Sequence, residues 1–154
     1  MKPNNKKETP LVFYPTFCET IRPEANGQFT YIGVFQSSIS VDVFPYEFHQ
    51  FSVAIAVIGT PDQLAGDVKI SVCVDDRIVG GASIDGSAEG LTPNEDGLVF
   101  CNFHIIGNEL IVHKPSSITA NITINGVTYV SPNSVRLRKS GAKPSAQKGR
   151  AGTR

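Results

Sequence analysis

The stretch ITANITINGVTYV (residues 118–130) contains two runs of alternating apolar and polar residues on either side of Asn125-Gly126. Asn-Gly is the pair that two-residue β-hairpin turns favour, because both turn residues adopt positive φ. A turn at this pair places Ile124 opposite Val127, and the next apolar pair falls on the same face. Turn chemistry and hydrophobic register therefore agree, and the stretch predicts an antiparallel hairpin.

Strand periodicity continues through most of the chain. Residues 68–75 (VKISVCVD) place four apolar side chains on one face, and residues 99–105 alternate in the same way. Residues 51–58 are apolar on both faces, which predicts a central strand covered by layers on both sides. Residues 77–84 and 134–138 are shorter strand candidates, the first of them paired with residues 68–75.

Turn and loop signals separate these runs. Residues 23–27 (PEANG) predict a turn that joins a strand near 13–21 to one near 28–35. Residues 85–97 (DGSAEGLTPNEDG) are polar and acidic, and we expect them to form a long surface loop. Helical periodicity is not sustained over ten residues anywhere, because ten Pro and fourteen Gly interrupt the chain.

Together these patterns predict an all-β fold, an immunoglobulin-like antiparallel β-sandwich of about seven to nine strands, with a barrel as the alternative. The 154 residues correspond to one domain, and a 40% hydrophobic content suffices for a core. We expect a flexible N-terminal segment over residues 1–10, the sandwich over 11–138 and a disordered basic tail over 139–154.

The charges are segregated along the chain. All fourteen carboxylates lie between Glu8 and Glu109, and residues 8–134 contain only four basic residues, which gives this body a formal charge of −10. The other ten basic residues lie in the two ends of the chain. An acidic body has little reason to bind phosphate backbones itself, whereas the basic C-terminal region suits loose, salt-sensitive contacts.

The cysteines and the N-terminus bear on the cellular compartment. Cys18, Cys73 and Cys101 form no CxxC pair, and each lies in an apolar stretch, which favours buried reduced thiols. A Cys73–Cys101 disulfide is the alternative if their strands are neighbours. The N-terminus has no sustained apolar run, so we expect no secretory signal, no membrane span and a cytoplasmic location.

Residues 17–35 (FCETIRPEANGQFTYIGVF) combine a Cys-acidic strand, an Asn-Gly turn and a strand ending Ile-Gly-Val-Phe. This segment resembles the opening of an uncharacterised bacterial family that is known only as a domain of unknown function. The resemblance implies a small immunoglobulin-like sandwich, sometimes encoded by phages, and implies no activity or catalytic residues. Structure alone also explains the motif, because Asn26-Gly27 suits a turn and Gly33 suits a bulge.

No catalytic or metal-binding motif is present. GxSxG, GxxxxGK[ST], HExxH and a DxDxDG loop are all absent. The acidic loops could gather carboxylates for Ca²⁺ or for hydrolysis, and His49 and His104 could meet a carboxylate in the folded chain. We expect ordinary surface and turn roles instead, and therefore a non-enzymatic protein without metal or cofactor.

Two kinds of contact surface remain. The first hypothesis is a structural or binding module that contacts a protein or another copy through strand edges and the aromatics Phe44, Tyr46 and Phe48. The second is tethering to nucleic acid or an acidic partner by the basic end. A solubilising extension and a tail that folds back on the acidic body are the plain alternatives, and no small-molecule substrate is evident. The residues of the basic end are Arg136, Arg138, Lys139, Lys143, Lys148, Arg150 and Arg154.

Overall fold

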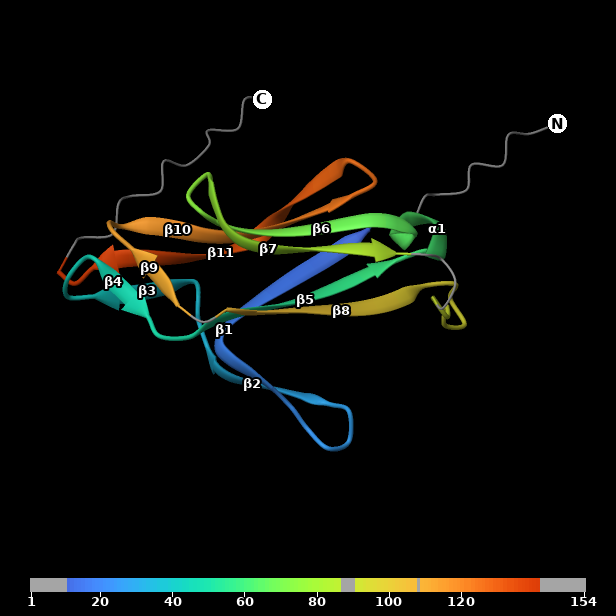
Figure 1. Cartoon of the computed structure of the whole chain (residues 1–154), viewed down its shortest axis with the longest axis horizontal. Coiled ribbons are helices and arrows are strands. Elements are labelled where there is room, and N and C mark those ends of the chain that lie inside the picture. The colour runs from blue at the N-terminus through green and yellow to red at the C-terminus, as the bar shows by residue number, and fades with distance from the viewer. Residues whose placement is uncertain (1–10, 87–90, 108, 142–154) are drawn as a thin grey trace, which may run out of the picture.

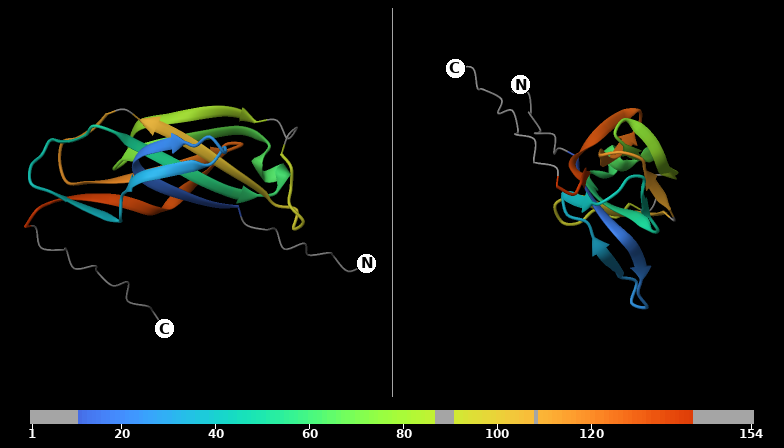
Figure 2. Two further views of the ribbon diagram at one scale, coloured as in Figure 1. Left: turned by 90° about the horizontal axis from the view of Figure 1, so that it is seen from below. Right: turned by 90° about the vertical axis from the view of Figure 1, so that its left-hand side faces the viewer.

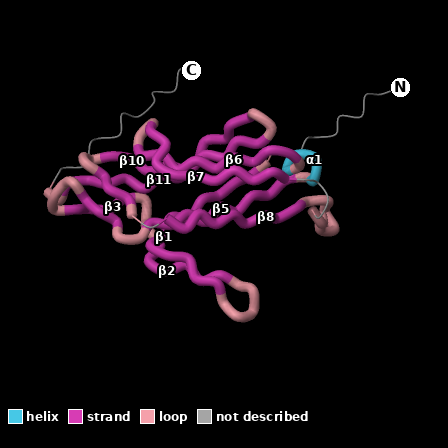
Figure 3. The backbone as a smooth tube through the Cα atoms, in the orientation of Figure 1, coloured by secondary structure: helices cyan, strands magenta, loops and turns pink. Residues whose placement is uncertain are grey.

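A computed structural model describes residues 11–86, 91–107 and 109–141, which form eleven strands and one short helix (Figure 1). The elements are β1 (Val12–Pro23), β2 (Phe29–Val34), β3 (Ser38–Val41), β4 (Tyr46–Phe48), β5 (Phe51–Gly59), α1 (Pro61–Leu64), β6 (Gly66–Val74), β7 (Arg77–Gly86), β8 (Val99–Gly107), β9 (Leu110–Val112), β10 (Ser116–Ile124) and β11 (Val127–Lys139). Strands dominate the backbone trace throughout (Figure 3).

Two sheets lie face to face and enclose one core. The four-stranded sheet has the order β2-β1-β5-β8, and the five-stranded sheet has the order β3-β11-β10-β6-β7. A separate ribbon of β4 and β9 lies at one end of the molecule (Figure 1). The fold is therefore an all-β sandwich, as the sequence predicts, and not a closed barrel. The described residues form eleven strands, more than the seven to nine expected, because β3, β4 and β9 are short additional strands.

The core forms between the inner faces of the two sheets. The four largest side chains with almost no exposed surface are Ile55, Ile118, Ile122 and Leu137. They come from β5, β10 and β11, so the central strands of both sheets supply the middle of the core. Alternation along β10 is strict, with every second residue buried, which is typical of a strand covered on one face only.

The predicted hairpins form in the predicted register. Ile124 pairs with Val127, and the turn residues Asn125 and Gly126 have φ of 49° and 81°. Residues 68–74 lie in β6, whose inner side chains are buried, and residues 51–58 lie in β5, between β1 and β8. The expected cover on both faces of β5 is incomplete, because Ala56 on its outer face is exposed. A turn over residues 24–28 joins β1 to β2.

Strand β3 departs from the predicted antiparallel pattern, because it pairs with β11 in parallel. The chain crosses from one sheet to the other just before β3. The amide of Phe35 still donates to the carbonyl of Phe17 (2.8 Å), whereas the carbonyl of Ser37 accepts from the amide of Arg136 (3.0 Å). This crossing segment, residues 35–37, closes one side of the sandwich and delivers β3 alongside β11.

Two predicted boundaries change. Strand β7 runs to Gly86, so the loop expected over residues 85–97 begins later, and residues 87–90 lie outside the described part. Lys139, expected to begin the tail, is the last residue of β11, where it pairs with Val41. The amide of Ser140 also donates to the carbonyl of Val41 (2.8 Å), so sheet pairing extends past the expected end of the domain.

Candidate functional site

On the outer face of the four-stranded sheet, residues 12–16 of β1 and the outward residues of β5 and β8 include no Asp, Glu, Lys or Arg. We call this part of the sheet the uncharged face. It consists of Val12, Tyr14, Thr16, Ala54, Ala56, Ile58, Phe100, Asn102, His104 and Ile106. Strand pairing establishes this set, because residues directly opposite each other share a face and their neighbours in sequence point into the core. Tyr14, Phe100 and Ile106 are 57%, 60% and 60% exposed.

The β1–β2 hairpin bends away from the sandwich on the outer side of this sheet (Figures 1 and 2). Gly33 makes the bend sterically feasible. Its φ is +65°, and a side chain there would collide with the side chain of Glu19, which occupies that space. The pairing of β1 with β5 stays in register through Phe17 and Cys18. These two adjacent residues are both buried because Phe17 belongs to the main core and Cys18 to a second, smaller cluster.

The hairpin contacts one end of the uncharged face through aromatic rings. The Phe29 ring lies 4.0 Å from the His104 ring between centroids, and the Tyr31 hydroxyl lies 3.2 Å from Nε2 of His104. Beneath them Cys18, Ile21 and Ala54 form a small second core. Burial lowers the pKa of His104, because a charged imidazolium would lose hydration there. The face therefore stays uncharged at neutral pH.

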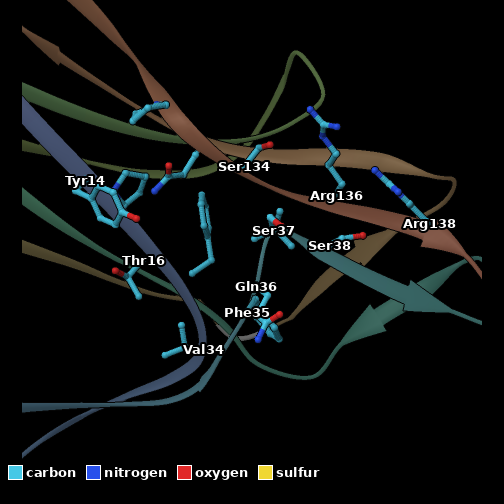
Figure 4. A pocket seen from close by; sticks show the side chains of 15 residues that line it. Tyr14, Thr16, Val34, Phe35, Gln36, Ser37, Ser38, Ser134, Arg136 and Arg138 are labelled. Atoms are coloured by element: carbon cyan, nitrogen blue, oxygen red, sulfur yellow. The ribbon is translucent and has the colours of Figure 1, made fainter. Parts of the chain in front are cut away.

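A pocket of about 560 Å³ lies between β1, the crossing segment and β11 (Figure 4). Its lining includes the hydroxyls of Ser37, Ser38 and Ser134 together with Arg136 and Arg138, and no carboxylate. The two arginines leave the same face of β11 and extend to the same side (Figure 4). Guanidinium groups beside hydroxyls suit a carboxylate or phosphate group.

Neither arginine of this pocket forms an ion pair with any residue that the structure describes. Strand pairing explains part of this, because Arg136 has Ser38 opposite on β3 and Ser117 opposite on β10. Sequence analysis assigned Arg136 and Arg138 to the basic end, and the structure places both within a paired strand. Lys143, Lys148, Arg150 and Arg154 lie outside the described residues.

The aromatics Phe44, Tyr46 and Phe48 do not form the exposed surface that the sequence suggested. Phe48 is 5% exposed and belongs to the main core, while Phe44 and Tyr46 are partly buried against that core. Phe48 lies edge-on to Phe51 and to Phe35, with centroids 5.2 and 5.3 Å apart. The short strand β4 directs the Phe48 side chain into the core, whereas the sequence prediction placed it on the surface.

The residues considered for catalysis or metal binding are scattered. Within the described ranges, no group of three His, Cys, Asp or Glu side chains lies close enough to hold a metal ion. His49 contacts Glu47 on the surface (3.2 Å), whereas His104 contacts the hairpin. Asp75 occupies a turn, where its carboxylate accepts from the amide of Ser117 (2.9 Å).

All three cysteines are free thiols, and Cys73 and Cys101 lie on strands of different sheets. The disulfide alternative therefore has no neighbouring strands to join. Burial raises the pKa of each thiol, and the charges of Glu19 and Asp76 add to the effect at Cys18 and Cys73. A raised pKa disfavours the thiolate, so none of these groups has the character of an activated nucleophile.

No protein-family model matches the sequence, and a search of curated proteins found no match. The resemblance of residues 17–35 to an uncharacterised family stays a prediction. Of the residues that the structure describes, none belongs to a helix long and apolar enough to cross a membrane.

Sequence reasoning missed the uncharged face, although a signal for it exists. Strand β8 (VFCNFHIIG) contains no acidic residue, lysine, arginine or proline, and the outward residues 12, 14 and 16 of β1 and those of β5 are also uncharged. Only the pairing of β1, β5 and β8 brings these positions side by side. The uncharged face could not be predicted because the sequence does not reveal the order of the strands in the sheet.

Proposed function

We propose that this chain is a non-enzymatic binding module that contacts a protein partner through the uncharged face. The observation that carries the proposal is the exposure of Tyr14, Phe100 and Ile106, each more than half accessible, on a sheet face without an ionised side chain. Val12, Ile58 and Phe100 lie directly opposite one another, with Tyr14 beside them, and adjacent exposed apolar side chains of this kind often mark a protein interaction site.

The energetics favour a protein rather than a charged ligand. Full burial of one large apolar side chain contributes about 1.5 to 3 kcal/mol. Aromatic residues such as Tyr14 and Phe100 are the side chains that most often dominate protein interfaces. A neutral His104 adds polarity without the desolvation cost of a buried charge.

Site-specific photo-crosslinking tests this function. A photoreactive phenylalanine analogue replaces Tyr14 in the full chain, expressed in the cells that naturally make it. The matched control carries the analogue at Val130, which is 69% exposed but lies on β11 in the other sheet. We expect a discrete protein adduct from position 14 and none from position 130. Absence of any adduct from position 14 and from a second variant with the analogue at Phe100 would overturn the proposal.

A second candidate function is tethering to nucleic acid. The observation that favours it is the pair Arg136 and Arg138, free of described ion pairs, on the strand that leads into the basic end of the chain. Such a cationic strand would provide a fixed start for phosphate contacts that the following residues continue. This binding would be weak, indifferent to sequence and steeply salt-dependent.

Binding to a short DNA duplex at low and high salt tests the tethering. Because pairing extends past Lys139, the truncated chain should end at Gly141 so that the sheet stays intact. We expect truncation to weaken binding most and the double substitution Arg136→Ala with Arg138→Ala to weaken it further. Unchanged affinity after both changes contradicts the tethering.

A further inference from the structure

The inner face of β7 has no strand above it among the described residues. Gly80, Ala82 and Ile84 pair with the buried β6 residues Val72, Ile70 and Val68, so all three face the core side of the sheet. Ala82 is nevertheless exposed, and Ile84 is 38% exposed. The inner side of this edge strand is therefore in contact with solvent.

The opposing sheet shows the same gap from the other side. Strand β8 is the last strand of the four-stranded sheet, and its inward-facing residues Cys101, Phe103 and Ile105 are only partly buried. The sandwich is closed on its opposite side by the crossing segment. Among the described residues, no strand fills the space between β7 and β8, where a further strand next to β8 would lie above β7.

The adjacent glycines Gly80 and Gly81 of β7 show where the gap between the sheets has room for a side chain. A side chain built on Gly80 would meet no atom within 4 Å, although Gly80 faces the core side. A side chain on its neighbour Gly81 would collide with the backbone carbonyl of Ile70. The space above Gly80 on the inner side of β7 is therefore unoccupied, whereas the clash at Gly81 is with the backbone of the paired strand β6.

We propose that an extended segment of another protein adds to the free edge of β8 as a strand and covers the inner side of β7. This inference rests on the proposed function and names the form of the partner. Backbone N–H and C=O groups of β8 that point away from β5 would form hydrogen bonds with the segment. Alternate side chains of the segment would contact Phe103 and fill the space above Gly80. Natural sheets usually protect such an edge with charges or proline, and β8 has neither.

Charge defines the ends of this partner segment. Strand β8 is uncharged over its whole length, but Glu95 and Asp96 precede it and Glu109 follows it, all exposed. The fitting segment is therefore apolar in its centre and basic at both ends. Residues 1–10 (MKPNNKKETP) and 142–154 (AKPSAQKGRAGTR) contain no alternating apolar run, so this chain's own ends do not supply it.

The first experiment titrates the full chain with the labelled nine-residue peptide Lys-Lys-Val-Thr-Val-Thr-Val-Lys-Lys, matched to the length of β8. Fluorescence anisotropy reports binding, and amide hydrogen exchange reports protection of β8. We expect Gly80→Phe, which fills the space, to weaken binding about tenfold, and Gly80→Ala to leave it nearly unchanged. A peptide with glutamate in place of its four lysines should bind more weakly.

Thermal unfolding first verifies that both Gly80 variants are folded. Equal binding by wild type and Gly80→Phe, or no peptide binding at about millimolar concentration, overturns strand addition. Combining Gly80→Phe with the crosslinker at Tyr14 separates the two proposals. An adduct that persists in this variant refutes strand addition and preserves the binding module, whereas loss of the adduct supports both.

Discussion

At the residue scale, single backbone positions decide whether neighbouring loops can meet. Gly66 has φ of +112°, and a side chain there would overlap the Asn125 side chain. That amide is not free to move, because its Nδ2 donates to the carbonyl of Ala65 at 2.7 Å. Gly66 therefore allows the hairpin turn at Asn125 to dock on the segment after α1.

We expect Gly66→Ala to lower the free energy of unfolding by about 2 to 4 kcal/mol, because strain and a steric clash add. Gly97→Ala is the matched control, since Gly97 also has positive φ but a methyl group added there would have no atom within 4 Å. Its expected cost is about 1 to 2 kcal/mol. Urea unfolding measures both, and equal costs would show that the docking at Asn125 contributes nothing.

His104 gives the stability a pH dependence whose sign follows from its environment. Burial lowers its pKa in the folded state below the ordinary value of 6.5. As the pH falls below 6.5, His104 binds a proton in the unfolded chain before it does so in the folded chain. The free energy of unfolding therefore decreases until the pH is below the pKa of His104 in the folded state. We expect His104→Gln to reduce this loss between about pH 7 and 5, measured by urea unfolding. A variant as acid-sensitive as the wild type would contradict this assignment.

At the element scale, the β1–β2 hairpin is held in its bent position by few contacts. Phe29 and Tyr31 touch His104, and both are more than a third exposed. We expect Phe29→Ala to raise the hydrogen-exchange rate of β2 amides about tenfold while β5 amides stay protected. Ile32→Ala, on the same strand, should have a smaller effect. Uniform loss of protection in both strands would mean that the hairpin and the core unfold together.

The elements also show how far sequence patterns reach. Strict alternation identified β6, β8 and β10, and the Asn-Gly turn gave the β10–β11 register. The patterns missed β3, β4 and β9, because strands of three or four residues show too little periodicity. Phe48 was expected at the surface for the same reason, since a three-residue strand does not reveal which face turns inward.

At the scale of the whole molecule, both sheets share one core and should unfold in one cooperative transition. Ile118 on β10 has no exposed surface and lies in the main cluster with residues of both sheets. We expect Ile118→Ala to lower the free energy of unfolding by about 2 to 5 kcal/mol. Ile78→Ala, at a position 65% exposed on β7, should change it by less than about 0.5 kcal/mol. Separate transitions in near- and far-ultraviolet circular dichroism would contradict a shared core.

The all-β class, the main strands, two hairpins and the separation of an acidic body from basic ends all follow from sequence patterns. These features are local, because alternation, turn residues and charge depend on neighbours within a few positions. The tertiary structure alone decided the strand order, and with it the uncharged face, the arginine pocket and the open side between β7 and β8. Each of these unites residues far apart in sequence, since β1, β5 and β8 become neighbours only when the sheet forms.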